Sequence, residues 1–130
     1  MSGKTTLRWA LALAYMAGIH LWTATGGRNP SSTLPFGVDK IVHLCEFGLL
    51  AWLLWRPWRE TCPRWAEGRT AVFVVLLTAL NGLGDELHQV FLPHRNATWG
   101  DLAADIAGGG AAVMWCLHRE KARPRATTQG

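Results

Sequence analysis

The sequence predicts an all-α protein, a four-helix transmembrane bundle whose N- and C-termini are both cytoplasmic. Three observations lead to this fold class. Four apolar segments alternate with short polar stretches, basic residues are concentrated in every second stretch, and several of the eight Trp residues lie near segment ends. Trp is enriched where helices cross the interface between lipid and water. A length of 130 residues is enough for one domain.

The four apolar segments are each close to the length of a membrane span. A hydrocarbon core of about 30 Å requires roughly 20 residues of helix. Because proline is poorly tolerated inside a helix, we expect Pro57 and Pro63 to keep the second helix from continuing into the following loop. The segments run approximately over Leu7–Trp22, Val38–Trp55, Thr70–Leu92 and Trp99–Leu117.

The distribution of basic residues orients the bundle. Outer stretches hold only Arg28, Lys40 and Arg95. This bias follows the positive-inside rule, and a soluble bundle has no reason to alternate basic and non-basic loops. A soluble bundle of amphipathic helices is the alternative, since the mean hydropathy is only +0.08. With the N-terminus inside, the cytoplasmic stretches contain Lys4, Arg8, Arg56, Arg59, Arg64, Arg69, Arg119, Lys121, Arg123 and Arg125.

We expect residues 1–118 to form one membrane domain and residues 119–130 to form a basic, disordered cytoplasmic tail. The net charge is +4, but the basic residues do not alternate with aromatic residues on one surface, so no nucleic-acid partner is expected. Membrane lipids are the expected partners. The cysteines Cys45, Cys62 and Cys116 form no CxxC motif. The sequence therefore predicts no metal site, and we expect no cofactor.

Polar residues gather toward the outer ends of three segments. In the second segment, Lys40, His43 and Glu46 are spaced by three and share one helical face, and Asp39 can cap the helix or complement its dipole. In the fourth segment, Thr98 begins a capping box. The further polar residues of the third and fourth segments are Asp85, Glu86, Gln89, Asp101 and Asp105.

Three carboxylates are predicted to lie at one depth. Glu46 lies seven residues after Asp39, Asp85 seven residues before Leu92 and Asp105 seven residues after Thr98. At the helical rise per residue, this spacing places each about 10 Å into the bundle. Buried acids beside a histidine can serve in general acid/base catalysis, and they can also bind a cation or relay a proton. The alternative is a network that only holds the helices together. His20 and His88 are expected to pack or to lie at the interface.

These residues and their order resemble the VanZ-like family of small bacterial membrane proteins. The resemblance spans roughly 39–109 and rests on Asp39-Lys40-x-x-His43-x-x-Glu46-Phe47, Asp85-Glu86-x-x-Gln89, Pro93-x-Arg95 and Asp101-x-x-x-Asp105-x-x-Gly108. It implies four membrane-spanning helices in the bacterial inner (plasma) membrane. The family takes its name from a protein that raises resistance to the glycopeptide teicoplanin. Two positions depart from the family pattern. This chain has His94 where the family usually has Gly, and Asp105 where the family often has Asn.

The resemblance and the polar cluster together lead to two function hypotheses. The first is a protein that binds or acts on a cell-envelope or lipid-linked molecule at the outer leaflet, a cell-wall precursor or a glycopeptide among them. In its enzymatic form, Glu46 or Asp85 transfers a proton and His43 or Arg95 stabilises charge. The candidate binding residues are Asp39, Lys40, Glu86, Gln89, Arg95, Asp101 and Asp105.

The second hypothesis is a non-enzymatic membrane scaffold whose polar cluster only fastens the helices. Small residues at Ala104, Gly108 and Ala112 recur every four positions, which lets helices approach closely in lipid. This small-residue face suits a homodimer as well as packing within one chain.

Overall fold

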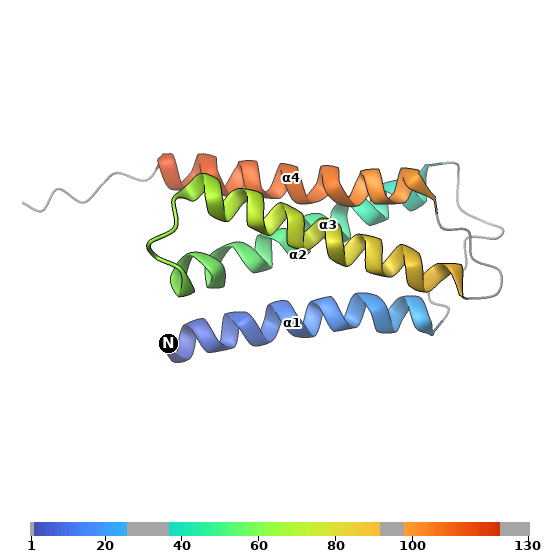
Figure 1. Cartoon of the computed structure of the whole chain (residues 1–130), viewed down its shortest axis with the longest axis horizontal. Coiled ribbons are helices and arrows are strands. Elements are labelled where there is room, and N and C mark those ends of the chain that lie inside the picture. Colours follow the sequence, from blue (N-terminus) through green and yellow to red (C-terminus); the bar gives the residue numbers. More distant parts are fainter. Residues whose placement is uncertain (1, 26–36, 92–97, 123–130) are drawn as a thin grey trace, which may run out of the picture.

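The chain folds into four helices, as the sequence predicts. The computed structural model describes residues 2–25, 37–91 and 98–122, and these ranges contain helices and no strand. Figure 1 shows the helices running alongside one another in alternating directions. Their bounds are Gly3–Ala24 for α1, Val38–Thr61 for α2, Glu67–Val90 for α3 and Trp99–Lys121 for α4.

Helices α2 and α3 form the centre of the bundle. Each of them contacts all three other helices, whereas α1 and α4 each contact only α2 and α3 in the described part of the chain. In Figure 1, α1 lies along one side of the α2–α3 pair and α4 along the other. The largest fully buried apolar side chains, Phe47, Leu50, Leu54 and Trp55, all come from α2.

Glycine allows α2 and α4 to approach closely. A Cβ at Gly108 would overlap the backbone carbonyl of Leu44, and one at Gly48 would lie 3.2 Å from the carbonyl oxygen of Gly108. Gly108 belongs to the predicted small-residue face of the fourth segment. At Gly108 this face is therefore used for packing within the chain.

The expectation that the second helix stops before Pro57 is wrong. Helix α2 continues through Pro57 to Thr61, and Cys62 is its C-cap. Tertiary contacts hold the turn beyond the proline. Glu60 accepts hydrogen bonds from Thr5 and Arg8, and Thr61 accepts one from the indole Nε1 of Trp9 at 2.8 Å. These bonds to α1 offset the backbone hydrogen bond that a proline cannot donate.

We expect Glu60→Ala to lower the free energy of unfolding by about 1 kcal/mol, because it removes two hydrogen bonds, one of them charge-assisted, at a partly exposed site. Thermal melting of the full chain in mild detergent would measure this change. The matched control is Glu67→Ala, since Glu67 is more exposed and its only described ion pair, with Arg59, spans 3.9 Å. Equal effects of the two substitutions would contradict a role for Glu60 in tethering α1 to α2.

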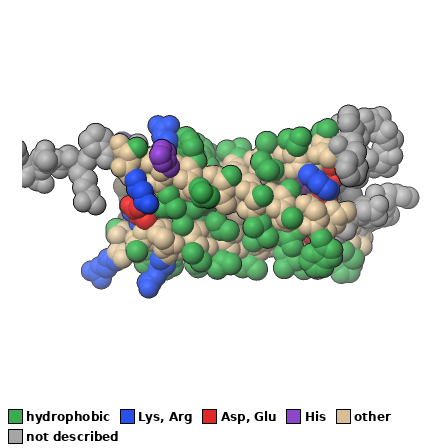
Figure 2. Space-filling model, turned by 90° about the horizontal axis from the view of Figure 1, so that it is seen from above, with side chains coloured by type: hydrophobic (Ala, Val, Ile, Leu, Met, Phe, Trp, Pro, Cys, Tyr) green, Lys and Arg blue, Asp and Glu red, His purple; other side chains and the backbone are tan. Residues whose placement is uncertain are grey.

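The outer surface of the bundle is largely apolar. Figure 2 shows hydrophobic side chains along one face, with Lys and Arg mainly near the end that holds the N-terminus. Exposed large apolar residues occur on all four helices, for example Leu11, Leu49, Leu76, Leu80 and Met114. Of the helices in the described ranges, α3 is long and apolar enough to qualify by length and composition as a membrane span.

Candidate functional site

The predicted polar residues lie at the end of the bundle opposite the N-terminus. The start of α2, the end of α3 and the start of α4 meet there (Figure 1). Many of these polar side chains are buried between the helices, whereas the outer surface described above is largely apolar. The buried members are His43, Asp85, Glu86, Gln89, Asp101 and Asp105.

The first group, named the Lys40 cluster, joins the first turns of α2 and α4. The ammonium of Lys40 donates to Asp39 at 3.1 Å and to Asp101 at 2.9 Å. Half of the predicted capping box forms, because the backbone N–H of Asp101 donates to the Thr98 hydroxyl, and that hydroxyl donates to the Asp101 carboxylate at 2.6 Å. The backbone N–H of Thr98 donates to Glu86 and not to Asp101. Asp39 does not cap α2; the N-cap is Gly37, at a φ of 90°. Asp39 lies in the first turn, where a carboxylate complements the helix dipole.

The second group, named the His43 cluster, joins α2, α3 and α4 one turn deeper. The imidazole Nδ1 of His43 lies 2.9 Å from a carboxylate oxygen of Asp105, and both side chains are buried. Glu86 of α3 completes the group, since one ligand-type atom from each residue lies within 4.8 Å of the other two. The imidazole ring of His43 also lies parallel to the ring of Phe47, with the two centroids 6.2 Å apart.

The third group, named the Asp85 cluster, joins α3 to α1. The amide of Gln89 donates to Asp85 at 3.0 Å. His20 of α1 lies 3.6 Å from the same carboxylate through Nδ1, and its Nε2 is 3.0 Å from the side-chain oxygen of Asn81. Asp85 is completely buried. His20, which the sequence predicts to pack or to lie at the interface, is therefore also a polar contact of the site.

Glu46 is half-buried one turn beyond His43, and the hydroxyl of Tyr15 donates to its backbone carbonyl at 3.3 Å. Arg95 lies outside the described residues.

Gly82 provides the room that Asp105 occupies. A Cβ at Gly82 would lie 2.5 Å from a carboxylate oxygen of Asp105 and 3.1 Å from its Cβ. Thr98 is a second residue to which the sequence assigns only a capping role. Its backbone N–H donates to Glu86 at 3.0 Å and so ties the start of α4 to the end of α3.

A pocket of about 250 Å³ opens beside these clusters. Glu86 and Thr98 supply its polar wall. The remaining lining is apolar and comprises Leu83, Leu87, Val90, Trp99 and Leu102. The pocket thus combines an apolar wall, which suits a hydrocarbon chain, with a buried carboxylate.

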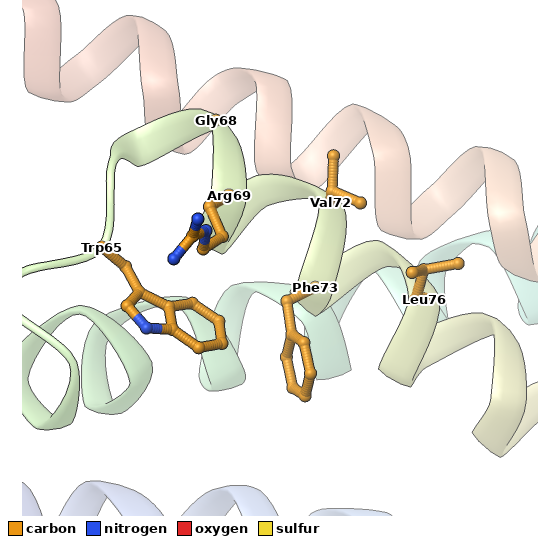
Figure 3. Close-up of a pocket in the computed structure, with 6 residues that line it drawn as sticks. All are labelled: Trp65, Gly68, Arg69, Val72, Phe73 and Leu76. Carbon is orange, nitrogen blue, oxygen red and sulfur yellow. The ribbon is translucent and has the colours of Figure 1, made fainter.

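A larger concavity lies on the other half of α3, away from the polar clusters. Figure 3 shows its lining by Trp65, Gly68, Arg69, Val72, Phe73 and Leu76. Arg69 lies over the indole of Trp65, at 5.7 Å from the ring centroid. Arg69 is the only titratable side chain in this lining, and it is exposed. This concavity therefore offers fewer groups for binding or catalysis than the pocket beside Glu86.

The fold and the site define an all-α protein with four helices, one candidate membrane span and a group of ionisable residues buried at one end. The family model described as VanZ/LLP1 matches residues 5–119, and the chain belongs to this family. The match confirms the resemblance seen in the sequence, and the family supports a membrane protein. Comparisons with curated proteins and with solved structures gave no significant match.

Proposed function

We propose that this VanZ/LLP1 protein crosses the bacterial inner membrane with all four helices and binds or acts on a lipid-linked cell-envelope molecule at the outer leaflet. The termini are cytoplasmic in this proposal. Its support is the basic end of the bundle, which matches the positive-inside rule, and the exposed apolar side chains on every helix. The polar clusters then belong to the outer end.

The pocket beside Glu86 is the observation that carries the proposal. Its apolar lining accommodates an acyl or prenyl chain, while Glu86 and Thr98 offer polar groups to the adjoining headgroup. Lys40, close to Thr98 and Asp101, adds a positive charge near the same rim. A lipid-linked substrate presents both kinds of chemistry, so it fits this site better than a fully water-soluble molecule.

The test is a susceptibility assay. A sensitive Gram-positive host expressing the wild-type chain is challenged with teicoplanin and with vancomycin, beside hosts expressing Asp85→Asn and, as a control, Glu67→Gln. Asp85 is buried in the site, whereas Glu67 is partly exposed at the opposite end of the same helix. We expect wild type and Glu67→Gln to protect selectively and Asp85→Asn to lose protection at equal membrane abundance.

Protection by Asp85→Asn at the wild-type level would contradict a functional role for this carboxylate. The absence of protection from wild type would remove glycopeptide resistance as the role in that host. Reporter fusions at the C-terminus and in the loop after α1 test the orientation separately, since the proposed topology requires opposite sides for these two positions.

The scaffold hypothesis is favoured by one observation: every polar cluster bridges helices. The Lys40 cluster connects α2 to α4, the His43 cluster adds α3, and the Asp85 cluster connects α3 to α1. A scaffold predicts that Asp85→Asn loses melting temperature along with function. A variant that melts like wild type in detergent yet fails in the assay would exclude this reading.

A further inference from the structure

Three buried side chains from three helices converge in the His43 cluster. His43 is 5% exposed, Glu86 is 6% exposed and Asp105 is completely buried. Each offers one nitrogen or carboxylate oxygen within 4.8 Å of the other two. Because the residues are 43 and 19 positions apart along the chain, only the packing of α2, α3 and α4 brings these atoms together.

Glu86 points to a ligand inside this cluster. Its Oε2 accepts the backbone N–H of Thr98 at 3.0 Å, whereas its Oε1 is buried without any hydrogen-bond partner in the described part of the chain. Burying a polar atom without a hydrogen-bond partner costs free energy of folding. Such an atom in a native structure therefore calls for an explanation, and one explanation is a bound ion. A cation bound between Glu86, His43 and Asp105 would satisfy it.

The donor set selects the class of ion. Imidazole nitrogen suits first-row transition metals and zinc, and carboxylate oxygen is shared by these ions and manganese, whereas magnesium and calcium prefer oxygen alone. Ligand atoms bound at about 2.1 Å in the tetrahedral geometry of zinc lie about 3.4 Å apart. The observed separations of up to 4.8 Å therefore require the side chains to move together by about 1 Å.

We propose that His43, Glu86 and Asp105 form a site for one divalent ion of the zinc or manganese type. Three protein ligands leave coordination positions for water or for a bound molecule, as in catalytic rather than structural zinc sites. Glu86 also lines the 250 Å³ pocket, so a molecule in that pocket would meet the ion. The proposal concerns metal binding alone and stands whether or not the proposed function holds.

The test measures retention of metal by the purified full chain in detergent. Chelator-treated protein is incubated separately with Zn²⁺ and with Mn²⁺ and desalted, and its metal content is determined by elemental mass spectrometry. We expect wild type to retain close to one ion per chain. We expect Glu86→Gln and Asp105→Asn to bind roughly tenfold more weakly or worse, since even residues that only orient ligands have effects of this size.

Glu86→Gln is the sharper variant, because its amide oxygen can still accept the Thr98 N–H while the charge is lost. The matched control is Glu67→Gln, on the same helix at the opposite end of the bundle, which should retain the ion. An independent readout is the melting temperature of wild type, which the ion should raise and a chelator should lower.

The proposal is overturned if wild type retains neither ion, or if Glu86→Gln and Asp105→Asn retain as much as wild type. Equal retention would mean an adventitious ion elsewhere on the chain. Should both variants fail to fold, the wild-type melting curve decides: no difference between the metal-loaded and chelator-treated protein would also overturn the proposal.

Discussion

Gly108→Ala is expected to destabilise the bundle by about 3 kcal/mol, at the upper end of the cost of overpacking a core. The added Cβ would overlap the backbone carbonyl of Leu44, and backbone cannot swing aside as a flexible side chain can. Helices α2 and α4 would have to separate along their contact. The measurement is thermal melting of the full chain in mild detergent, followed by circular dichroism.

Gly110→Ala is the matched control for this prediction. Gly110 lies on the same helix two residues further on, and a Cβ there would meet nothing within 4 Å. Alanine is the better helix former by about 1 kcal/mol, so this variant should melt at or above the wild-type temperature. If Gly108→Ala melts like Gly110→Ala, the close approach of α2 and α4 is not a determinant of stability.

The number and order of the helices could be predicted from the sequence because each apolar segment is long and bounded by polar residues. The ends could not. Pro57 is a strong local signal to stop, yet α2 continues past it to Thr61. The contacts that hold this last turn come from Thr5, Arg8 and Trp9, some fifty residues earlier in the chain. A prediction from neighbouring residues alone cannot include contacts between residues that are so far apart in the sequence.

The end of the bundle that holds the site was predictable, but its pairings were not. Counting residues along each segment predicts that Asp105 lies level with Glu46, whereas in the structure Asp105 contacts His43, one turn from Glu46, at 2.9 Å. Such counting does not give the rotation of each helix about its axis. That rotation pairs His43 with Asp105 and directs Glu86 to them, while Asp85 is directed toward His20 of α1. One feature of the sequence could have indicated that His20 contacts the site: it is the only histidine of α1 and lies in a largely apolar run.

His43→Leu is expected to lower the free energy of unfolding by about 3 kcal/mol, because it removes the imidazole and leaves the carboxylate of Asp105 buried without that partner. The companion variant Asp105→Asn keeps the size of the side chain and removes its charge. In the double variant, the buried group that faces the new leucine side chain is neutral. The double variant should therefore be more stable than the sum of the single effects predicts, by about 1–3 kcal/mol.

The cycle is measured by melting in detergent with a chelator present, so that any bound cation is removed and only the pair itself contributes. His88→Leu is the matched control, because the side chain of His88 has no hydrogen bond or ion pair among the described residues and should change stability little. Strict additivity of the two single effects would mean that His43 and Asp105 are not coupled. A large coupling would show that the pair fastens α2 to α4, and losses of function beyond that stability cost would then be attributable to the site's chemistry.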